Sequence, residues 1–126
     1  MTLFEECKEA LSADFSVLDG QSLKDAMDIL NEYPFSSGGV VWSEMKSSDY
    51  ESIDDLLSEN LIKKSDVFVF ADDTSIPIFR TKLNLIAENV YDVTALSPKL
   101  FIFNDEVILQ PLFPTEMIRL GIKAKL

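Results

Sequence analysis

Apolar residues recur at helical spacing in the first half of the chain, and they predict helices there. Residues 3–12 are predicted to form the first helix, because Thr2 and Glu5 make a capping-box pattern ahead of one apolar face. Residues 23–33 are predicted to form the second, since their apolar positions again share one face and Pro34 cannot continue a helix. The N-terminal half is therefore predicted to be mainly helical.

A third helix is predicted after a short strand over residues 40–42. Ser48 and Glu51 repeat the capping pattern, and the apolar positions that follow them have helical spacing. The rest of this helix is acidic at Asp49, Glu51, Asp54, Asp55 and Glu59. The third helix is therefore predicted to carry the densest acidic patch of the protein.

The second half of the chain changes to patterns typical of strands. Residues 67–70 form a continuous β-branched and aromatic run, which predicts a central strand buried on both faces. Residues 72–75 have turn chemistry, and residues 76–79 are predicted to be extended at a sheet edge or bulge because they contain Pro77. A helix is predicted from residue 81 to about residue 90, where apolar residues return to helical spacing.

The clearest local signal is a β-hairpin. Two apolar runs, over residues 100–103 and 107–109, predict its strands. Asn104 and Asp105 predict its two-residue loop, because Asn and Asp tolerate the left-handed conformation that such a loop requires.

Two further segments complete the pattern. Residues 92–96 are predicted as a strand, and residues 117–122 as either a strand or a short helix. No internal repeat, linker or low-complexity segment divides the sequence. We therefore predict one domain over residues 1–126 with an α+β fold, in which N-terminal helices pack on a mostly antiparallel sheet formed mainly by the C-terminal half.

Charge is the feature of the composition that says most about partners. The 126 residues carry a formal net charge of −11, and most of the excess lies in residues 1–63, where 14 acidic residues stand against 4 basic ones. Direct binding of nucleic acid is disfavoured, because contacts to phosphates need a surplus of Lys and Arg. Two interpretations of the acidic half stay open, which are solubility and attraction to a basic protein partner.

Few side chains are available for catalysis. The chain has no histidine, which removes the commonest general base and the nucleophile pairs that depend on it. Its single cysteine, Cys7, falls on the apolar face of the first helix, which predicts a buried thiol rather than a disulfide or a zinc ligand. No motif indicates a nucleotide site, and no cofactor is expected.

The compartment is predicted from the same composition. The longest apolar runs are far shorter than the ~20 residues of a membrane span, and the first residues lack the basic and apolar regions of an export signal. We therefore expect a cytoplasmic protein without a membrane span.

Asp72 and Asp73 follow the predicted central strand and form the most enzyme-like feature. Paired carboxylates after a strand are a common place for a catalytic magnesium ion. One hypothesis is therefore a metal-dependent phosphoesterase, in which Asp105 or Glu106 completes the site. The simpler interpretation is a turn, because two adjacent Asp residues here precede Thr and Ser.

A binding surface is the main non-catalytic hypothesis. Two aromatic and two acidic residues lie in the segment around the start of the third helix, and these are Trp42, Glu44, Asp49 and Tyr50. This composition suits aromatic anchors surrounded by charges that steer a partner. The alternatives are that Trp42 covers the core at a strand end, and that the acidic helix is a solvated face.

The segments of the second half share a further pattern. A strand and turn over residues 67–78 are followed by segments 92–97, 101–103 and 118–121. In this combination residues 67–121 resemble small bacterial immunity proteins of contact-dependent growth inhibition systems, the CdiI-like family. The resemblance implies a non-enzymatic inhibitor that binds the C-terminal toxin domain of a cognate effector, and such toxins are frequently nucleases.

Charge and resemblance lead to one functional prediction. We expect an immunity protein whose acidic half covers the basic surface of a nuclease toxin in a one-to-one complex. A DNA-mimic inhibitor is an alternative, because carboxylates can imitate phosphates. The residues predicted to bind the toxin are Trp42, Glu44, Asp49, Tyr50, Glu51, Asp54, Asp55, Glu59, Asp72 and Asp73.

Overall fold

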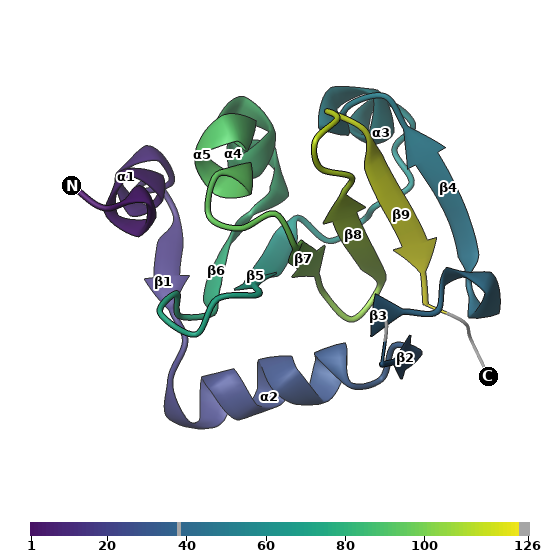
Figure 1. Ribbon diagram of the computed structural model, residues 1–126, viewed down its shortest axis with the longest axis horizontal. Helices are drawn as coiled ribbons and strands as arrows, with labels where there is room; N and C mark the ends of the chain where they lie inside the picture. Colours follow the sequence, from purple (N-terminus) through teal and green to yellow (C-terminus); the bar gives the residue numbers. More distant parts are fainter. Residues whose placement is uncertain (38, 124–126) are drawn as a thin grey trace.

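The computed structural model describes residues 1–37 and 39–123 and has the predicted α+β fold (Figure 1). Its helices are α1 (Leu3–Ala10), α2 (Gly20–Leu30), the short 3₁₀ helix η1 (Trp42–Glu44), α3 (Ile53–Ser58), α4 (Leu83–Glu88) and α5 (Val90–Thr94). Its strands are β1 (Phe15–Val17), β2 (Phe35–Ser36), β3 (Gly39–Val40), β4 (Lys46–Tyr50), β5 (Asp66–Ala71), β6 (Phe79–Lys82), β7 (Leu100–Phe103), β8 (Val107–Pro111) and β9 (Ile118–Ile122). None of the described helices is long and apolar enough to cross a membrane.

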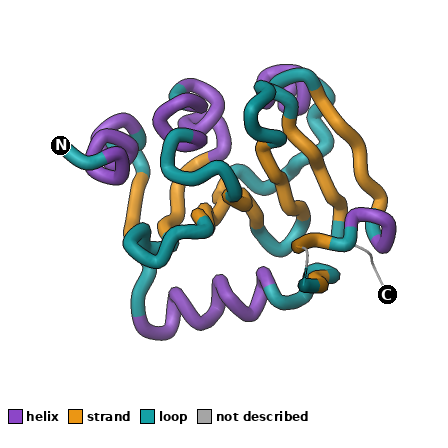
Figure 2. The backbone as a smooth tube through the Cα atoms, viewed as in Figure 1, coloured by secondary structure: helices purple, strands orange, loops and turns teal. Residues whose placement is uncertain are grey.

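Seven of these strands form one antiparallel sheet in the order β1-β6-β5-β7-β8-β9-β4. Strands β5 to β9 come from the C-terminal half of the chain and make up the inside of the sheet, whereas the edge strands β1 and β4 come from the N-terminal half. Figure 2 shows the strands of this sheet with helices on both sides of it. The predicted antiparallel sheet, formed mainly by the C-terminal half, is confirmed.

The sheet is covered on both faces, because successive residues of a strand point to opposite sides. On β5, Val67 and Val69 belong to a core shared with α1, α3, α4 and α5. Phe68 and Phe70 pack instead on a second core, formed with α2. Figure 1 shows the first group of helices along one side of the sheet and α2 along the other. These two sides are termed the four-helix face and the α2 face, and β5 is the predicted interior strand.

The first two helices form in the predicted segments, but α1 ends at Ala10 instead of residue 12, and α2 spans Gly20–Leu30 instead of residues 23–33. Thr2 caps α1, because its hydroxyl accepts a hydrogen bond from the Glu5 N–H at 3.1 Å. Cys7 is buried as predicted, and this burial, together with the nearby negative charge of Asp92, raises the pKa of its thiol to about 12. α2 begins three residues earlier than predicted, since Ser22 lies inside its first turn and not at the cap.

The start of the predicted third helix is wrong. The edge strand β4 occupies the segment that contains Asp49 and Tyr50, and the helix begins later, as α3. Ser52 caps this helix, its hydroxyl accepting from the Asp55 N–H at 3.2 Å. A Ser followed three residues later by an acidic residue occurs twice here, at Ser48 and at Ser52, and the second occurrence is the cap.

Two strand predictions in the second half are also wrong. β6 begins at Phe79, the last residue of the predicted extended segment, so the following helix begins later than residue 81, as α4. Residues 92–96 are not a strand, because α5 extends to Thr94. Val93 and Leu96 are both buried. Val93 and Leu96 are three positions apart, a spacing that predicts a helix, whereas the β-branched residues of the segment predicted a strand.

The hairpin prediction is confirmed by β7 and β8, with a shifted loop. The Asn104 N–H donates to the Val107 carbonyl at 3.0 Å, so the two-residue turn consists of Asp105 and Glu106 instead of Asn104 and Asp105. For the last segment the strand alternative is confirmed, because β9 pairs with both β8 and β4.

Candidate protein-binding surface

Four of the predicted binding residues lie together on the surface at α3. They are Glu51, Asp54, Asp55 and Glu59, and they are termed the acidic segment. All four are exposed, and none of them forms an ion pair within residues 1–37 and 39–123. Exposed carboxylates without a cation beside them project their negative potential into solvent, where it can act on a partner.

α3 turns the acidic segment outward because its apolar residues fix the opposite side. Ile53 and Leu56 are buried in the core of the four-helix face. Asp54 and Asp55 occupy the first turn, where the helix dipole favours negative charge. Glu59 caps the C-terminal end, where the helix dipole disfavours negative charge. Its carboxylate therefore does not stabilise the helix through the dipole.

Asp49 lies on the α2 face. It pairs with Arg119 of β9, whose neighbours on both sides, Ile118 and Leu120, are buried in the core of the four-helix face, and successive strand residues point to opposite faces. Its carboxylate accepts two hydrogen bonds from the Arg119 guanidinium, at 2.7 and 3.0 Å. This pairing holds the pKa of Asp49 below its usual range. The charge of Asp49 is therefore largely compensated within the fold, unlike the charges of the acidic segment.

The predicted strand before the third helix ends at Val40, because Trp42 begins η1. Trp42 is half-buried against the core of the α2 face, and Arg119 stands 5.8 Å from the centre of its ring. This packing supports the interpretation that Trp42 covers the core. Glu44 is exposed at the end of η1, and Tyr50 is half-buried on the four-helix face, where β4 leads into the acidic segment.

Asp72 and Asp73 lie in the turn after β5, which confirms the turn interpretation. The Asp73 carboxylate accepts from the Ser75 N–H at 2.9 Å and from the Ser75 hydroxyl at 2.7 Å, and these bonds hold the pKa of Asp73 below its usual range. β5 and β4 are four strand positions apart, so these two carboxylates are on the order of 20 Å from the acidic segment at ordinary strand spacing. The structure does not join them to it.

The carboxylates of the phosphoesterase hypothesis lie at opposite ends of β7. The Asp72 N–H donates to the Lys99 carbonyl at 2.9 Å, just before β7 begins, whereas Asp105 and Glu106 follow the last residue of that strand. Across the described part of the chain, no three Asp, Glu or Cys side chains are grouped so that they could hold a metal ion. The predicted grouping of Asp72 and Asp73 with either later carboxylate is therefore wrong.

A groove that the sequence did not indicate borders the acidic segment. It has a volume of about 480 Å³ and lies between the start of α3, α5 and the loop that joins β8 to β9. Its accessible floor is apolar and includes the half-buried Val90, Pro111 and Met117, while core residues such as Ile86 line it from within the fold. Two aromatic residues in its lining are unusually exposed, Tyr91 at 68% and Phe113 at 67%.

The polar part of the groove is acidic. Asp54 of the acidic segment and Glu116 of the β8–β9 loop both line it, and no lysine or arginine is among the described lining residues. The Tyr91 hydroxyl donates to the Glu116 carboxylate, which links α5 to the loop and raises the pKa of Tyr91. The groove therefore combines an apolar floor with negatively charged walls.

The sequence could not reveal this groove, because its walls come from segments near residues 52, 90, 98 and 115. No local pattern connects these segments before the sheet forms. The nearest signal was Phe113, an aromatic residue in a segment without strand or helix periodicity.

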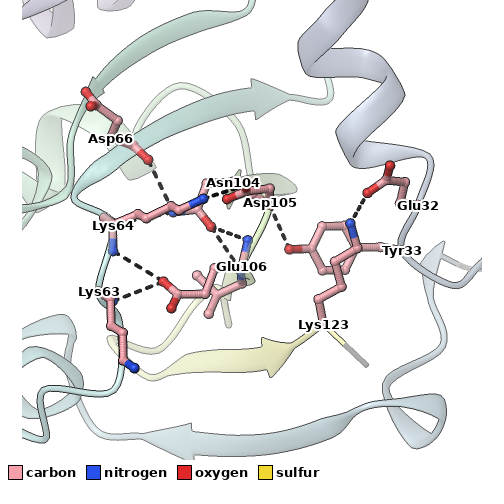
Figure 3. A network of polar contacts seen from close by, with 10 residues as sticks. Glu32, Tyr33, Lys63, Lys64, Asp66, Asn104, Asp105, Glu106 and Lys123 are labelled. Carbon is pink, nitrogen blue, oxygen red and sulfur yellow. Dashed lines mark hydrogen bonds and ion pairs between the residues drawn. The ribbon is translucent and has the colours of Figure 1, made fainter. Parts of the chain in front are cut away.

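A polar network holds the turn of the β7–β8 hairpin (Figure 3). Asn104 is only 4% exposed, and its side-chain amide donates to two carbonyls and accepts from two N–H groups. Those backbone groups belong to Lys64, Asp66, Glu106 and Val107. The Tyr33 hydroxyl donates to the Asn104 carbonyl at 2.7 Å, and burial raises the pKa of this hydroxyl. These residues are termed the turn network, and their bonds within the fold mark it as structural.

A comparison with protein families finds a match for this chain. A family model described as "CdiI immunity protein EcoliA0-like" matches residues 1–121 of the 126 residues. The match includes the N-terminal helices and the acidic segment, which lie outside the stretch that carried the resemblance. No match to the chain was found among curated proteins. The predicted family is confirmed.

Proposed function

This chain belongs to the CdiI immunity protein family, and we propose that it binds the C-terminal toxin domain of a cognate effector and thereby neutralises it. The observation that supports this mode of action is the acidic segment, four exposed carboxylates with no ion-pair partner in the described residues. The inhibitor acts in the cytoplasm by covering the toxin in a one-to-one complex, and it performs no chemistry of its own.

The toxin that suits such a surface is a basic nuclease. A nuclease must present Lys and Arg side chains to the phosphates of its substrate. This chain carries a formal net charge of −11, and its surplus of acids lies in residues 1–63, which contain the acidic segment. A carboxylate surface that covers the phosphate-binding residues would exclude the nucleic acid by competition.

The acidic segment acts mainly on the rate of association. Opposite charges speed the encounter of two proteins, and charges at the rim of an interface change the association rate more than the dissociation rate. Glu44, Asp72 and Asp73 add to the same field from a greater distance. At physiological salt the Debye length is about 8 Å, so the two Asp residues contribute less than the acidic segment does.

The proposal is tested with the toxin domain encoded beside this chain's gene. Growth is measured with the toxin domain expressed alone and together with this protein, and cleavage of RNA and DNA by the purified toxin is measured with and without one equivalent of the inhibitor. Rescue of growth, loss of cleavage and a one-to-one complex by light scattering are expected. A toxin that binds the inhibitor but cleaves neither nucleic acid would overturn the nuclease assignment.

The role of the acidic segment is tested by reversing three of its charges, in the variant Asp54→Lys, Asp55→Lys and Glu59→Lys. We expect association with the toxin to slow at least about tenfold at low salt. The matched control is Glu6→Lys, Glu9→Lys and Asp28→Lys, which changes the net charge equally at exposed positions on α1 and α2. An equal slowing in both variants would show that only net charge matters, and it would remove α3 from the interface.

A further inference from the structure

We infer that the groove between α3, α5 and the β8–β9 loop receives a segment of the toxin in which an apolar side chain stands beside a lysine or arginine. This inference rests on the proposed function. It assigns to the groove the contacts that hold the complex together, whereas the acidic segment attracts the toxin electrostatically. In Figure 1 the three elements that form the groove lie along the same side of the sheet.

The apolar part of the occupant follows from the floor of the groove. The accessible floor includes the half-buried Val90, Pro111 and Met117, and the buried core residues of the four-helix face that also line the groove hold this floor in place. Its volume of about 480 Å³ lies in the range of built binding cavities. A rigid apolar floor contributes affinity when an apolar side chain replaces water on it.

The basic part of the occupant follows from the walls. Asp54 and Glu116 are the charged residues among those described as lining the groove, and both are negative. A Lys or Arg next to the buried apolar side chain would reach these carboxylates, while an acidic segment would be repelled by them. Asp54 belongs both to the groove and to the acidic segment, so the anchor and the attracting surface are continuous.

Exposed aromatic residues supply the third argument. Tyr91 and Phe113 are each about two-thirds exposed, and aromatic residues of this kind dominate the affinity of many interfaces. The Tyr91 hydroxyl donates to the Glu116 carboxylate, so this exposed ring lies directly beside an acidic wall of the groove.

A second copy of this chain fits the groove less well than a toxin segment does. Each copy carries a formal net charge of −11, so association of two copies would bring like charges together at a groove whose walls are already negative. The toxin, as a basic protein, brings the opposite charge.

The test removes the two exposed rings separately, in the variants Tyr91→Ala and Phe113→Ala, and measures binding of the toxin domain by surface plasmon resonance. Each variant is expected to dissociate about tenfold faster or more, with an association rate close to that of the unmodified protein. The matched control is Leu3→Ala, which removes an apolar side chain that is 54% exposed on α1, outside the groove. The control is expected to dissociate at the original rate.

The outcomes separate this inference from the proposed function. If the unmodified protein binds the toxin and both ring variants dissociate at its rate, the groove is not the anchor, although the immunity role stands. If the unmodified protein does not bind the toxin, both proposals fail. If light scattering shows a dimer that either ring variant converts to monomer, the groove holds a second copy and the toxin assignment is wrong.

Discussion

The turn network and the acidic segment use polar side chains in opposite ways. In the turn network, the side-chain amide of Asn104 both donates and accepts hydrogen bonds, and the neighbouring Lys64 ammonium lies 2.6 Å from the Asp105 carboxylate. Asp66 is paired with two cations on β6. The four carboxylates at α3 have no such partners among the described residues. Groups that bond within the fold stabilise it, and groups that the fold leaves unpaired at its surface are the ones available to another molecule.

The largest effect that separates the two regions is expected from Asn104→Ala. This change removes the side-chain partner of two carbonyls and two N–H groups, in one buried and three partly buried hydrogen bonds. At roughly 0.5–1 kcal/mol for each of these four bonds, we expect the free energy of unfolding to fall by about 3 kcal/mol. Urea unfolding followed by circular dichroism measures the change, with an unaltered slope against urea.

Asn31→Ala is the matched control for that experiment. It makes the same chemical change at an exposed position and is expected to shift the free energy of unfolding by less than about 0.5 kcal/mol. A loss below about 1 kcal/mol for Asn104→Ala would mean that water replaces the lost bonds, and the turn network would then not be what holds the hairpin. The toxin association rate is expected to be unchanged in both variants.

Periodic segments of the fold were predictable from the sequence, and segments without periodicity were not. The hairpin strands bury most of their apolar residues, and α1 buries Cys7 on its apolar face, so local spacing was sufficient. β4 is an edge strand whose first four residues are all exposed, so it has no buried face to produce an alternating pattern. Its pairing with β9 exists only in the folded sheet, and the segment was therefore assigned to the helix that follows it.

The candidate site was likewise predictable only where its residues are close together in the sequence. The charges of the acidic segment all lie within residues 51–59, so the sequence predicts them as one group. Asp49 belongs to the same run, but its compensation by Arg119 depends on a pairing between residues 70 positions apart. Asn104 was identified as a turn residue, yet its importance lies in side-chain bonds to a segment 38 to 40 positions earlier in the chain. Contacts of this range cannot be read from spacing.

A smaller loss in the free energy of unfolding is expected from Asp66→Asn, which removes a carboxylate that is paired within the fold. The Lys82 ammonium and the Arg80 guanidinium hold the pKa of Asp66 below its usual range. A carboxyl group with a lowered pKa in the folded state contributes stability above its unfolded pKa of about 3.9, and this contribution is lost as the pH falls through the folded pKa. Because Asp66 is largely exposed, we expect its contribution at pH 7 to be under about 1 kcal/mol.

The measurement is the free energy of unfolding of the unmodified protein and of Asp66→Asn between pH 7 and pH 2. The unmodified protein is expected to be the more stable at neutral pH, and the difference is expected to decrease below about pH 4 and to vanish below the folded pKa of Asp66. A difference that does not change with pH would mean that the variant acts through its shape, and the ion pairs on β6 would then contribute nothing measurable.

The smallest expected effect concerns the acidic segment itself. Glu59 lies at the C-terminal end of α3 and Asp54 in its first turn, so the helix dipole acts on them with opposite sign. Glu59→Gln is expected to raise the free energy of unfolding by about 0.3 kcal/mol, and Asp54→Asn to lower it by a similar amount. Both variants are expected to slow association with the toxin, because each removes one negative charge from the same surface.

These two variants separate what a carboxylate does for the fold from what it does for a partner. Their effects on stability differ in sign, whereas their effects on the association rate agree in sign. Chemical denaturation and stopped-flow binding at two salt concentrations measure the two quantities independently. If Glu59→Gln instead lowers stability, Glu59 is held by contacts within the fold and belongs with the residues of the turn network. If it raises stability and slows association, the carboxylate is unfavourable for its own helix and acts on the toxin.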